Sequence, residues 1–398
     1  MQKYLTEHIP GTGGVIKASM DDFLVTEIPA YEPCGFGEHI YLTIEKRGAT
    51  TLEAISRIAR KLRIREKDIG YAGMKDSFGI TRQTISAQRI RPEDAAEITL
   101  DGVRVLSAVR HTNKLRLGHL KGNRFTVVAR GVSGDALEYA DKVLDVLAKR
   151  GVPNCFGMQR YGVRGNSDLI GNAMARRDWK EAVDLLIGDP AEIRDEAWRE
   201  AVSAYVCGAV EESFKLMPRH CGGERDALRS LLKRPDDWEK AFAALNPRLK
   251  KIFLSACQSR LFDRVLQQRL TTIDRVMTGD VAWKHDNGAC FLVDDAAAEQ
   301  PRAERFEISA TGPMFGSGMK QPEGRPREME EEILAGEGIS PDSLNLGVGL
   351  RMEGTRRPLR VPLTEPYPRK LGDALYLEFA LPKGAYATSV MREITKTF

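Results

Sequence analysis

The chain has 398 residues, of which 42% are hydrophobic and 29% are charged, and its formal net charge is +4. This composition is ordinary for a globular protein, and the length predicts two domains because single cores rarely grow this large. The mild net charge does not by itself indicate a nucleic-acid partner. No apolar run approaches the roughly 20 residues that span a bilayer, and residues 1–8 lack an apolar signal region. We therefore expect a cytoplasmic protein with no membrane association.

The first 165 residues alternate short strands and helices. Strands are expected at residues 23–28, 39–44, 84–86, 103–106 and 125–129. A helix capped by Thr51 is expected between the second and third of these strands. Its buried face would carry Leu52, Ile55, Ile58, Ala59 and Leu62. A further helix over 136–149 is expected to stop at Gly151.

Helical spacing dominates after Asn166. Helices are expected at 178–186, 198–213, 225–232, 237–245 and 247–270, with a short acidic helix at 328–334. Residues 281–308 predict strands and loops, strands return at 359–363 and 374–379, and a last helix covers 388–395. The order sheet, helices, sheet predicts an α+β domain interrupted by a mostly helical insertion, with the C-terminal strands rejoining the first sheet.

Metal and nucleotide sites are not indicated. The six cysteines are widely spaced and form no CxxC pair, which argues against a structural zinc site and a dense disulfide framework. Gly312–Met319 is expected to be a Gly-rich loop, but it lacks the Lys-Ser/Thr ending of a phosphate-binding loop. We therefore expect no metal, no nucleotide cofactor and no other cofactor.

The segment from Tyr71 to Thr84 is the most informative stretch of the chain. It places Asp76 directly after Lys75, in a small-residue turn that is followed by a strand. A carboxylate held on a tight turn beside cations can stay ionised and act as a nucleophile. A lone aspartate in such a turn is more often a turn former or a helix cap, so this segment needs support from others.

Three other segments provide that support. Residues 103–131 contain seven Lys or Arg and no Asp or Glu, which favours phosphate contacts over a solvated hairpin. Phe156 lies among glycines with Asn154 and Arg160 nearby, a combination that is typical of sites that hold an unstacked base. Considered alone, the ring is more simply interpreted as part of the buried core. Lys17 precedes a strand, where it is either an ordinary surface lysine or the partner of a catalytic carboxylate.

Together these segments resemble the TruD family of tRNA pseudouridine synthases. The resemblance rests on Lys17 with the run Asp22–Glu27, on Ala72–Asp76, and on Asn154–Gly162. Further similar segments follow in the family's order up to Glu393: Gly37–Leu42, Gly122–Phe125, Ser255–Phe262, Gly354–Leu359 and Ala385–Glu393. Two departures are minor, namely Gly79 where many relatives have alanine and Cys155 where relatives are often aromatic. Nearly the whole chain is covered, so the agreement is far more specific than any single motif.

The resemblance implies the fold, the reaction and the roles of residues. The fold would be a mixed, mainly antiparallel sheet flanked by helices, with residues 1–165 and 340–398 forming the catalytic domain and 166–339 an inserted domain. The reaction would convert uridine to pseudouridine in tRNA, usually at uridine 13 of the D-arm, without any cofactor. Asp76 would be the catalytic carboxylate and Lys17 its partner. Phe156 would stack on the uracil, Asn154 would position Asp76 or the nucleotide, and Lys75 and Arg160 would contact the RNA. We expect a monomer.

Two alternatives stay open at this point. A noncatalytic RNA-binding or chaperone protein explains the basic stretch and the aromatic residues, but not the joint presence of Lys17, Asp76 and Asn154. A hydrolase that uses Asp76 as a base would need a second acid or a metal cluster, and the sequence offers neither.

Overall fold

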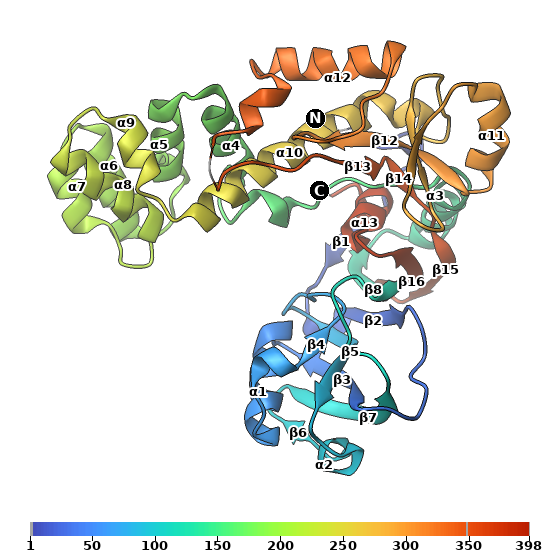
Figure 1. Cartoon of the computed structure of the whole chain (residues 1–398). Coiled ribbons are helices and arrows are strands. Elements are labelled where there is room, and N and C mark those ends of the chain that lie inside the picture. The colour runs from blue at the N-terminus through green and yellow to red at the C-terminus, as the bar shows by residue number, and fades with distance from the viewer. Residues whose placement is uncertain (1–2, 348, 398) are drawn as a thin grey trace. The chain divides into compact units, whose positions relative to one another are not determined.

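The computed structural model describes residues 3–347 and 349–397, which pack as two compact units (Figure 1). Unit 1 comprises residues 3–154 and 360–397, and unit 2 comprises the intervening residues from 155 to 359. The chain leaves unit 1 after strand β9 (Val152–Pro153) and returns at strand β14 (Arg360–Val361). These two strands pair with each other, with Arg360 opposite Pro153. The start and the end of unit 2 are therefore anchored side by side on unit 1, whereas the predicted domain limits at 165/166 and 339/340 stay a prediction.

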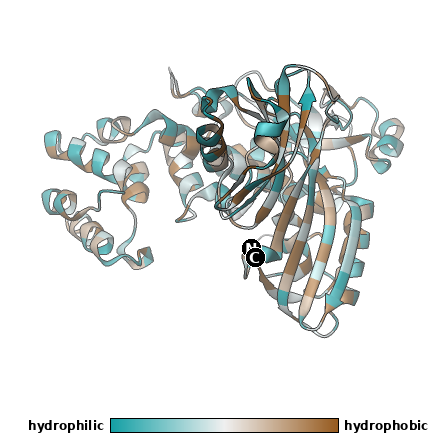
Figure 2. Cartoon of the chain, turned by 90° about the horizontal axis from the view of Figure 1, so that it is seen from below, coloured by the Kyte–Doolittle hydropathy of each residue, from teal (hydrophilic) through white to brown (hydrophobic). Residues whose placement is uncertain are grey.

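Unit 1 is built on a ten-stranded sheet whose strands lie side by side (Figure 2). The strand order is β15-β16-β8-β2-β5-β3-β7-β6, with β1 beside β8 and β4 beside β5. The pair β2–β5 is parallel and the other pairs are antiparallel. The strands are β1 (Gly13–Ile16), β2 (Phe23–Pro29), β3 (His39–Arg47), β4 (Gly70–Tyr71), β5 (Ile80–Gln88), β6 (Thr99–Leu100), β7 (Val103–His111), β8 (Leu120–Val132), β15 (Thr364–Leu371) and β16 (Ala374–Pro382). The predicted α+β fold class is confirmed, and β16 returns to the first sheet as predicted. The strand expected at 359–363 does not join this sheet, because β14 in that range pairs with β9, and the unpredicted β15 pairs with β16 instead.

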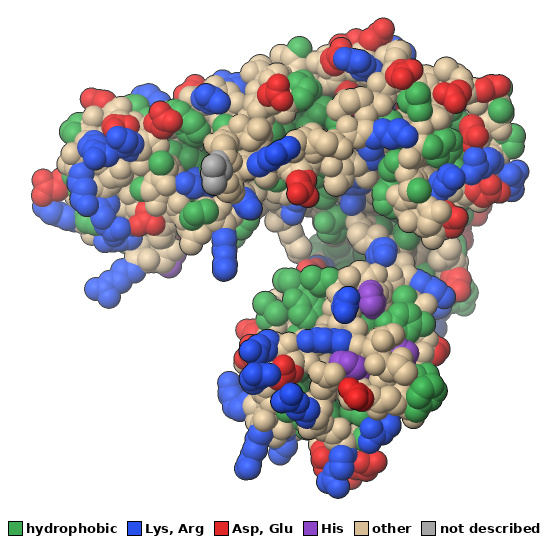
Figure 3. Space-filling model, viewed as in Figure 1, with side chains coloured by type: hydrophobic (Ala, Val, Ile, Leu, Met, Phe, Trp, Pro, Cys, Tyr) green, Lys and Arg blue, Asp and Glu red, His purple; other side chains and the backbone are tan. Residues whose placement is uncertain are grey.

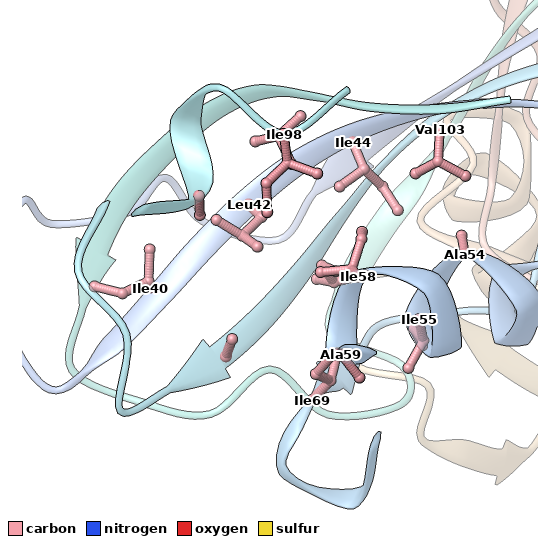
Figure 4. Close-up of a cluster of buried hydrophobic side chains, with 14 of the residues drawn as sticks. Ile40, Leu42, Ile44, Ala54, Ile55, Ile58, Ala59, Ile69, Ile98 and Val103 are labelled. Atoms are coloured by element: carbon pink, nitrogen blue, oxygen red, sulfur yellow. The ribbon is translucent and has the colours of Figure 1, made fainter. Parts of the chain in front are cut away.

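The helices of unit 1 pack on this sheet. They are α1 (Thr51–Leu62), α2 (Pro92–Ala96), α3 (Ala136–Arg150) and α13 (Ala387–Thr395). Ile40, Leu42 and Ile44 alternate along β3 and therefore point to one face, where they meet Ile55 and Ile58 of α1 (Figure 4). Tyr71, at the start of the segment that carries Asp76, packs against this cluster.

Two details of α1 differ from the prediction. Thr50, not Thr51, is the N-cap: its hydroxyl accepts a hydrogen bond from the Glu53 amide. Thr51 begins the helix, and its hydroxyl donates instead to Gln83. Leu52 is 52% exposed and does not belong to the buried face, because the helix is rotated so that Ala54 takes that place.

Unit 2 is mostly helical and carries a four-stranded antiparallel sheet of order β11-β10-β12-β13. Its helices are α4 (Ser167–Arg176), α5 (Trp179–Ile187), α6 (Glu196–Val206), α7 (Val210–Leu216), α8 (Gly222–Lys233), α9 (Trp238–Ala243), α10 (Pro247–Arg269), α11 (Ala296–Glu304) and α12 (Gly324–Gly336). Its strands are β10 (Val281–Lys284), β11 (Cys290–Leu292), β12 (Ile308–Met314) and β13 (Thr355–Pro358).

Three predictions about unit 2 were wrong. The single helix expected at 198–213 is two helices, because Gly208 adopts a left-handed φ of +79° between α6 and α7. Helix α11 lies inside the region expected to hold only strands and loops, where Asp295 caps its first turn. The first three residues of the Gly-rich segment 312–319 are not a loop, because they belong to β12 and pair with residues of β13.

Across the described ranges, no helix has both the length and the apolar character needed to span a bilayer.

Replacing Ile58 with alanine tests the α1 core. Because Ile58 is fully buried, the cavity should lower the free energy of unfolding of unit 1 by about 3 kcal/mol. Hydrogen exchange of β3 and β5 amides during urea unfolding measures this change. All four tryptophans lie between residues 179 and 283, so their fluorescence follows unit 2 separately. Leu52→Ala on the same helix is the matched control and should have little effect. Equal losses for the two variants would contradict the assigned core.

Candidate catalytic site

The Asp76 segment connects β4 to β5 and is tied down by hydrogen bonds from several parts of unit 1. The Gly118 amide donates to the Ala72 carbonyl at 2.8 Å, from the connection between β7 and β8. The Lys75 amide donates to the Thr51 hydroxyl at 2.9 Å, and the Gln83 side chain donates to the Gly73 carbonyl at 3.4 Å. A turn with its backbone anchored in this way holds its side chains in a defined place.

The structure brings Lys17 and Asp76 together. The ammonium of Lys17 lies 3.7 Å from the Asp76 carboxylate, whose side chain is 55% exposed. Lys17 directly follows β1 with a left-handed φ of +58°, and its ammonium lies 4.4 Å from the centre of the Phe23 ring. Such a backbone conformation is uncommon for a residue other than glycine. An ion pair this exposed contributes only about 0–1 kcal/mol to stability, so the Lys17–Asp76 pair adds little to the stability of the fold.

Lys75 turns to different partners from those of Asp76. Its ammonium lies 3.2 Å from a Glu27 carboxylate oxygen and donates to the Asn123 side chain at 2.7 Å. Both members of the Lys75–Glu27 pair are buried, at 7% and 2% side-chain exposure. Burial raises the pKa of Glu27, against the opposing charge of Lys75. Lys75 therefore braces the segment against β2 and β8, while its predicted contact with RNA stays a prediction.

Lys46 also contacts the Asp76 segment, although its role was not predicted from the sequence. Its ammonium donates to the Asp76 backbone carbonyl at 2.5 Å from within the core of unit 1. The signal was present, because Ile40, Leu42, Ile44 and Lys46 continue one alternating, inward-facing series along β3. A lysine in the last place of such a series is an exception that calls for a reason.

The remaining predicted residues flank the crossing between the units. Asn154 closes unit 1 after β9 and is buried, at 4% exposure. Phe156 is the second residue of unit 2 after the crossing, and its amide donates to Asp263 of α10 at 3.0 Å. Arg160 donates to the hydroxyls of Ser259 and Ser255, also on α10, at 2.9 and 2.5 Å.

Phe156 is a half-buried ring held by its neighbours within unit 2. It packs edge-to-face on Phe262 with ring centres 5.7 Å apart. The Arg357 guanidinium lies 4.4 Å from the centre of the ring, and Arg160 lies 5.5 Å from it. The sequence analysis assigned no role to Arg357. Its neighbour Arg356 points to the other face of β13, where it pairs with buried Glu330. A ring bordered by cations suits an electron-rich base beside a phosphate backbone.

The basic stretch 103–131 is only partly available for phosphates. Arg104 pairs with Glu45, Arg124 with Glu365 and Arg130 with Asp22. The guanidinium of Arg130 lowers the pKa of Asp22. In contrast, Arg116 and Lys121 are exposed and have no carboxylate partner in the part of the chain that the structure describes. The part of unit 1 that faces the viewer in Figure 3 carries many Lys and Arg side chains, with histidines and some Asp and Glu among them.

Comparisons with known proteins identify the family of the chain. The family model for tRNA pseudouridine synthase D (TruD) matches residues 1–394. The chain belongs to the TruD family of tRNA pseudouridine synthases. It is 60% identical to tRNA pseudouridine synthase D of Geobacter metallireducens over 395 residues, covering 99% of this chain and 98% of that protein. The corresponding protein of Thermus thermophilus is 38% identical, with coverage of 99% and 92%.

A solved structure shows the same fold. The crystal structure of a Methanosarcina mazei protein assigned to TruD has a TM-score of 0.85 and 28% identity, and the match covers 100% of this chain and 96% of that one. The chain is thus a TruD-family enzyme, an RNA-modifying isomerase, with the α+β fold that its sequence predicted. Within the described ranges, no group of three or more His, Cys, Asp or Glu side chains is placed to hold a metal ion.

Arg116 and Lys121 provide a test of RNA binding by this TruD-family chain. Replacing both with glutamine should weaken tRNA binding and flatten the dependence of log K on log salt by about 1.5, because each charge releases close to one counterion. Filter binding at several salt concentrations measures this slope. Arg104→Gln is the control and should change the slope less, since Glu45 already compensates its charge. A slope identical to that of the native chain would remove these two residues from the RNA surface.

Proposed function

We propose that this enzyme converts uridine 13 in the D-arm of tRNA to pseudouridine, with Asp76 as the catalytic carboxylate. The observation that supports this most directly is the Lys17–Asp76 pair, an exposed carboxylate on an anchored turn with a cation 3.7 Å away. An exposed acid that is fixed through its backbone is ready for a substrate rather than occupied by the fold. In the same proposal the enzyme acts as a cytoplasmic monomer, with residues 1–165 and 340–398 as the catalytic domain and 166–339 as the insertion.

The reaction needs a carboxylate and a bound base, and no other reagent. The target nucleotide leaves its stack, which costs a few kcal/mol. Asp76 then attacks C1′ of the ribose or C6 of the uracil, or assists formation of a glycal; all three routes use the same carboxylate. The N1–C1′ bond breaks, the uracil rotates, and a C5–C1′ bond forms. Any bond that Asp76 has formed to C1′ or C6 breaks again, which regenerates the carboxylate. The proton from C5 is lost and N1 gains one, so the product is an isomer and no oxidant or phosphate donor is consumed.

The other residues hold the reacting groups. Lys17 supplies a positive charge beside the carboxylate as charge shifts during the reaction. Phe156 stacks on the uracil, with Arg160 and Arg357 beside its ring. Asn154 positions the nucleotide or the Asp76 segment. Exposed cations such as Arg116 supply most of the affinity through phosphates, which do not report sequence.

Replacing Asp76 with asparagine separates an enzyme from an RNA-binding protein. The amide keeps the shape of the side chain but cannot act as a nucleophile. We expect tRNA binding to persist and pseudouridine formation to fall by at least about 10⁴-fold. The assay is mapping of pseudouridines in tRNA transcribed without modification, before and after incubation with the protein.

The control for this experiment is Asp101→Asn, since Asp101 is also exposed and lies in a turn of the same unit. It should retain full activity. Product formation by Asp76→Asn at the native rate would exclude Asp76 as the nucleophile. Binding by the native chain without any product would favour the noncatalytic alternative, and a product at a uridine other than 13 would correct the proposed target alone.

Phe156→Ala tests the stacking role. Base stacking on an aromatic side chain is worth about 1–3 kcal/mol, so single-turnover rates should fall by roughly ten- to a hundredfold while tRNA retention changes little. Phe156→Leu is the matched control, because it keeps apolar bulk against Phe262 but removes the aromatic face. Equal losses of rate and of binding in Phe156→Ala would count against stacking on the target base.

A further inference from the structure

Lys46 is the most unusual residue in the core of unit 1. It lies near the end of β3, its side chain is only 1% exposed, and it is among the largest fully buried side chains of the chain. In the described residues, no carboxylate lies within ion-pair distance of its ammonium. An isolated buried charge is costly, so the groups around the ammonium must account for its presence.

Backbone carbonyls surround the Lys46 ammonium. It donates to the Ala49 carbonyl at 2.7 Å and to the Asp76 carbonyl at 2.5 Å. The Lys75 carbonyl lies at 3.4 Å and the Thr81 hydroxyl at 3.5 Å. An ammonium has three protons in a tetrahedral arrangement, so one group can join the end of β3, the start of β5 and the turn between β4 and β5.

We propose that Lys46 is a positioning residue that fixes the backbone of Asp76 from beneath, so that the carboxylate above meets the target nucleotide. This inference rests on the proposed role of Asp76. Lys17 reaches the carboxylate from one side, whereas Lys46 reaches the carbonyl of the same residue from the core. Lys17 thus contacts the side chain of Asp76, and Lys46 contacts its backbone.

A positioning role explains why the charge is retained in the core. A methionine in this place would pack with Ile44 and the rest of the apolar face of β3, yet it would leave the carbonyls of Asp76 and Ala49 without their donor. The turn would then relax toward solvent, and displacement of a reacting group by as little as 1 Å reduces rates by about 100-fold. The fold itself loses no apolar contact in this exchange.

Titration of Lys46 makes the proposed positioning role visible in the dependence of the rate on pH. Burial lowers the pKa of Lys46 to about 8; the carboxylates of Asp76 and Glu53 oppose this shift, and the cation of Lys75 adds to it. Above that pH the neutral amine has two protons and holds the turn less firmly. The unfolded chain binds the Lys46 proton up to about pH 10.4, so between these values the unfolded state holds more protons and the free energy of unfolding rises with pH. Deprotonation of Lys46 in the folded chain therefore does not lower the free energy of unfolding, and it is not through instability that the rate constant would fall above about pH 8.

Lys46→Met is the first test, with Lys61→Met, an exposed lysine of α1, as the matched control. The measurements are the single-turnover rate constant at saturating enzyme, the dissociation constant of unmodified tRNA, and the melting curve. We expect the rate constant to fall roughly 100-fold, with tRNA binding and melting unchanged from the control. A rate constant equal to that of the control would overturn the proposal, as would parallel losses of rate and binding in a folded variant.

Lys46→Arg is the second test, and it tests the positioning role of Lys46 even if the methionine variant does not fold. Arginine keeps its charge and donors throughout the accessible pH range. The native chain should lose rate as pH rises through about 8, and this decline should be absent from the pH profile of Lys46→Arg. A decline shared by both chains would assign it to the substrate or to another group and overturn the role of Lys46. Activity of Asp76→Asn would instead overturn the proposed function, so the two failures are distinguishable.

Discussion

The structure depends on one constraint: the backbone of the turn from Ala72 to Gly79 is fixed while the carboxylate of Asp76 stays open to solvent. Amides and side chains from α1, β5 and the β7–β8 connection reach the backbone of this turn. The ammonium of Lys46 reaches it from the core. The role proposed for Asp76 requires a side chain that is free to bond and a backbone that keeps it in place, and anchoring the main chain instead of the carboxylate meets both requirements.

Cations around this turn have separate tasks. Lys75 is buried against Glu27 and braces β2, Lys46 holds carbonyl groups, and Lys17 alone lies beside the carboxylate. Three lysines with similar chemistry are thus distinguished by what they face. The alternation of side chains along strands and the left-handed backbone at Lys17 create these differences.

The insertion of unit 2 into unit 1 is arranged around the short pair β9–β14. Arg360 is buried there and donates to the Arg150 carbonyl at the end of α3. The motif Asn154–Gly162 begins at this crossing, so its first residue belongs to unit 1 and Phe156 to unit 2. A motif that is continuous in sequence is shared by two units because the chain changes unit within it.

The sequence alone predicted the fold class, six of the ten strands of the first sheet, the family, and the residues Lys17, Asp76 and Phe156 as candidates. It did so because strand alternation, glycine turns and ordered motifs are local patterns that survive without coordinates. Only the tertiary structure decided that Lys75 turns to Glu27, that Arg357 lies over Phe156, and that Lys46 holds the Asp76 carbonyl. Each of these contacts joins residues 25 or more positions apart, and the partner that a side chain meets follows from strand pairing and burial, which no local pattern encodes.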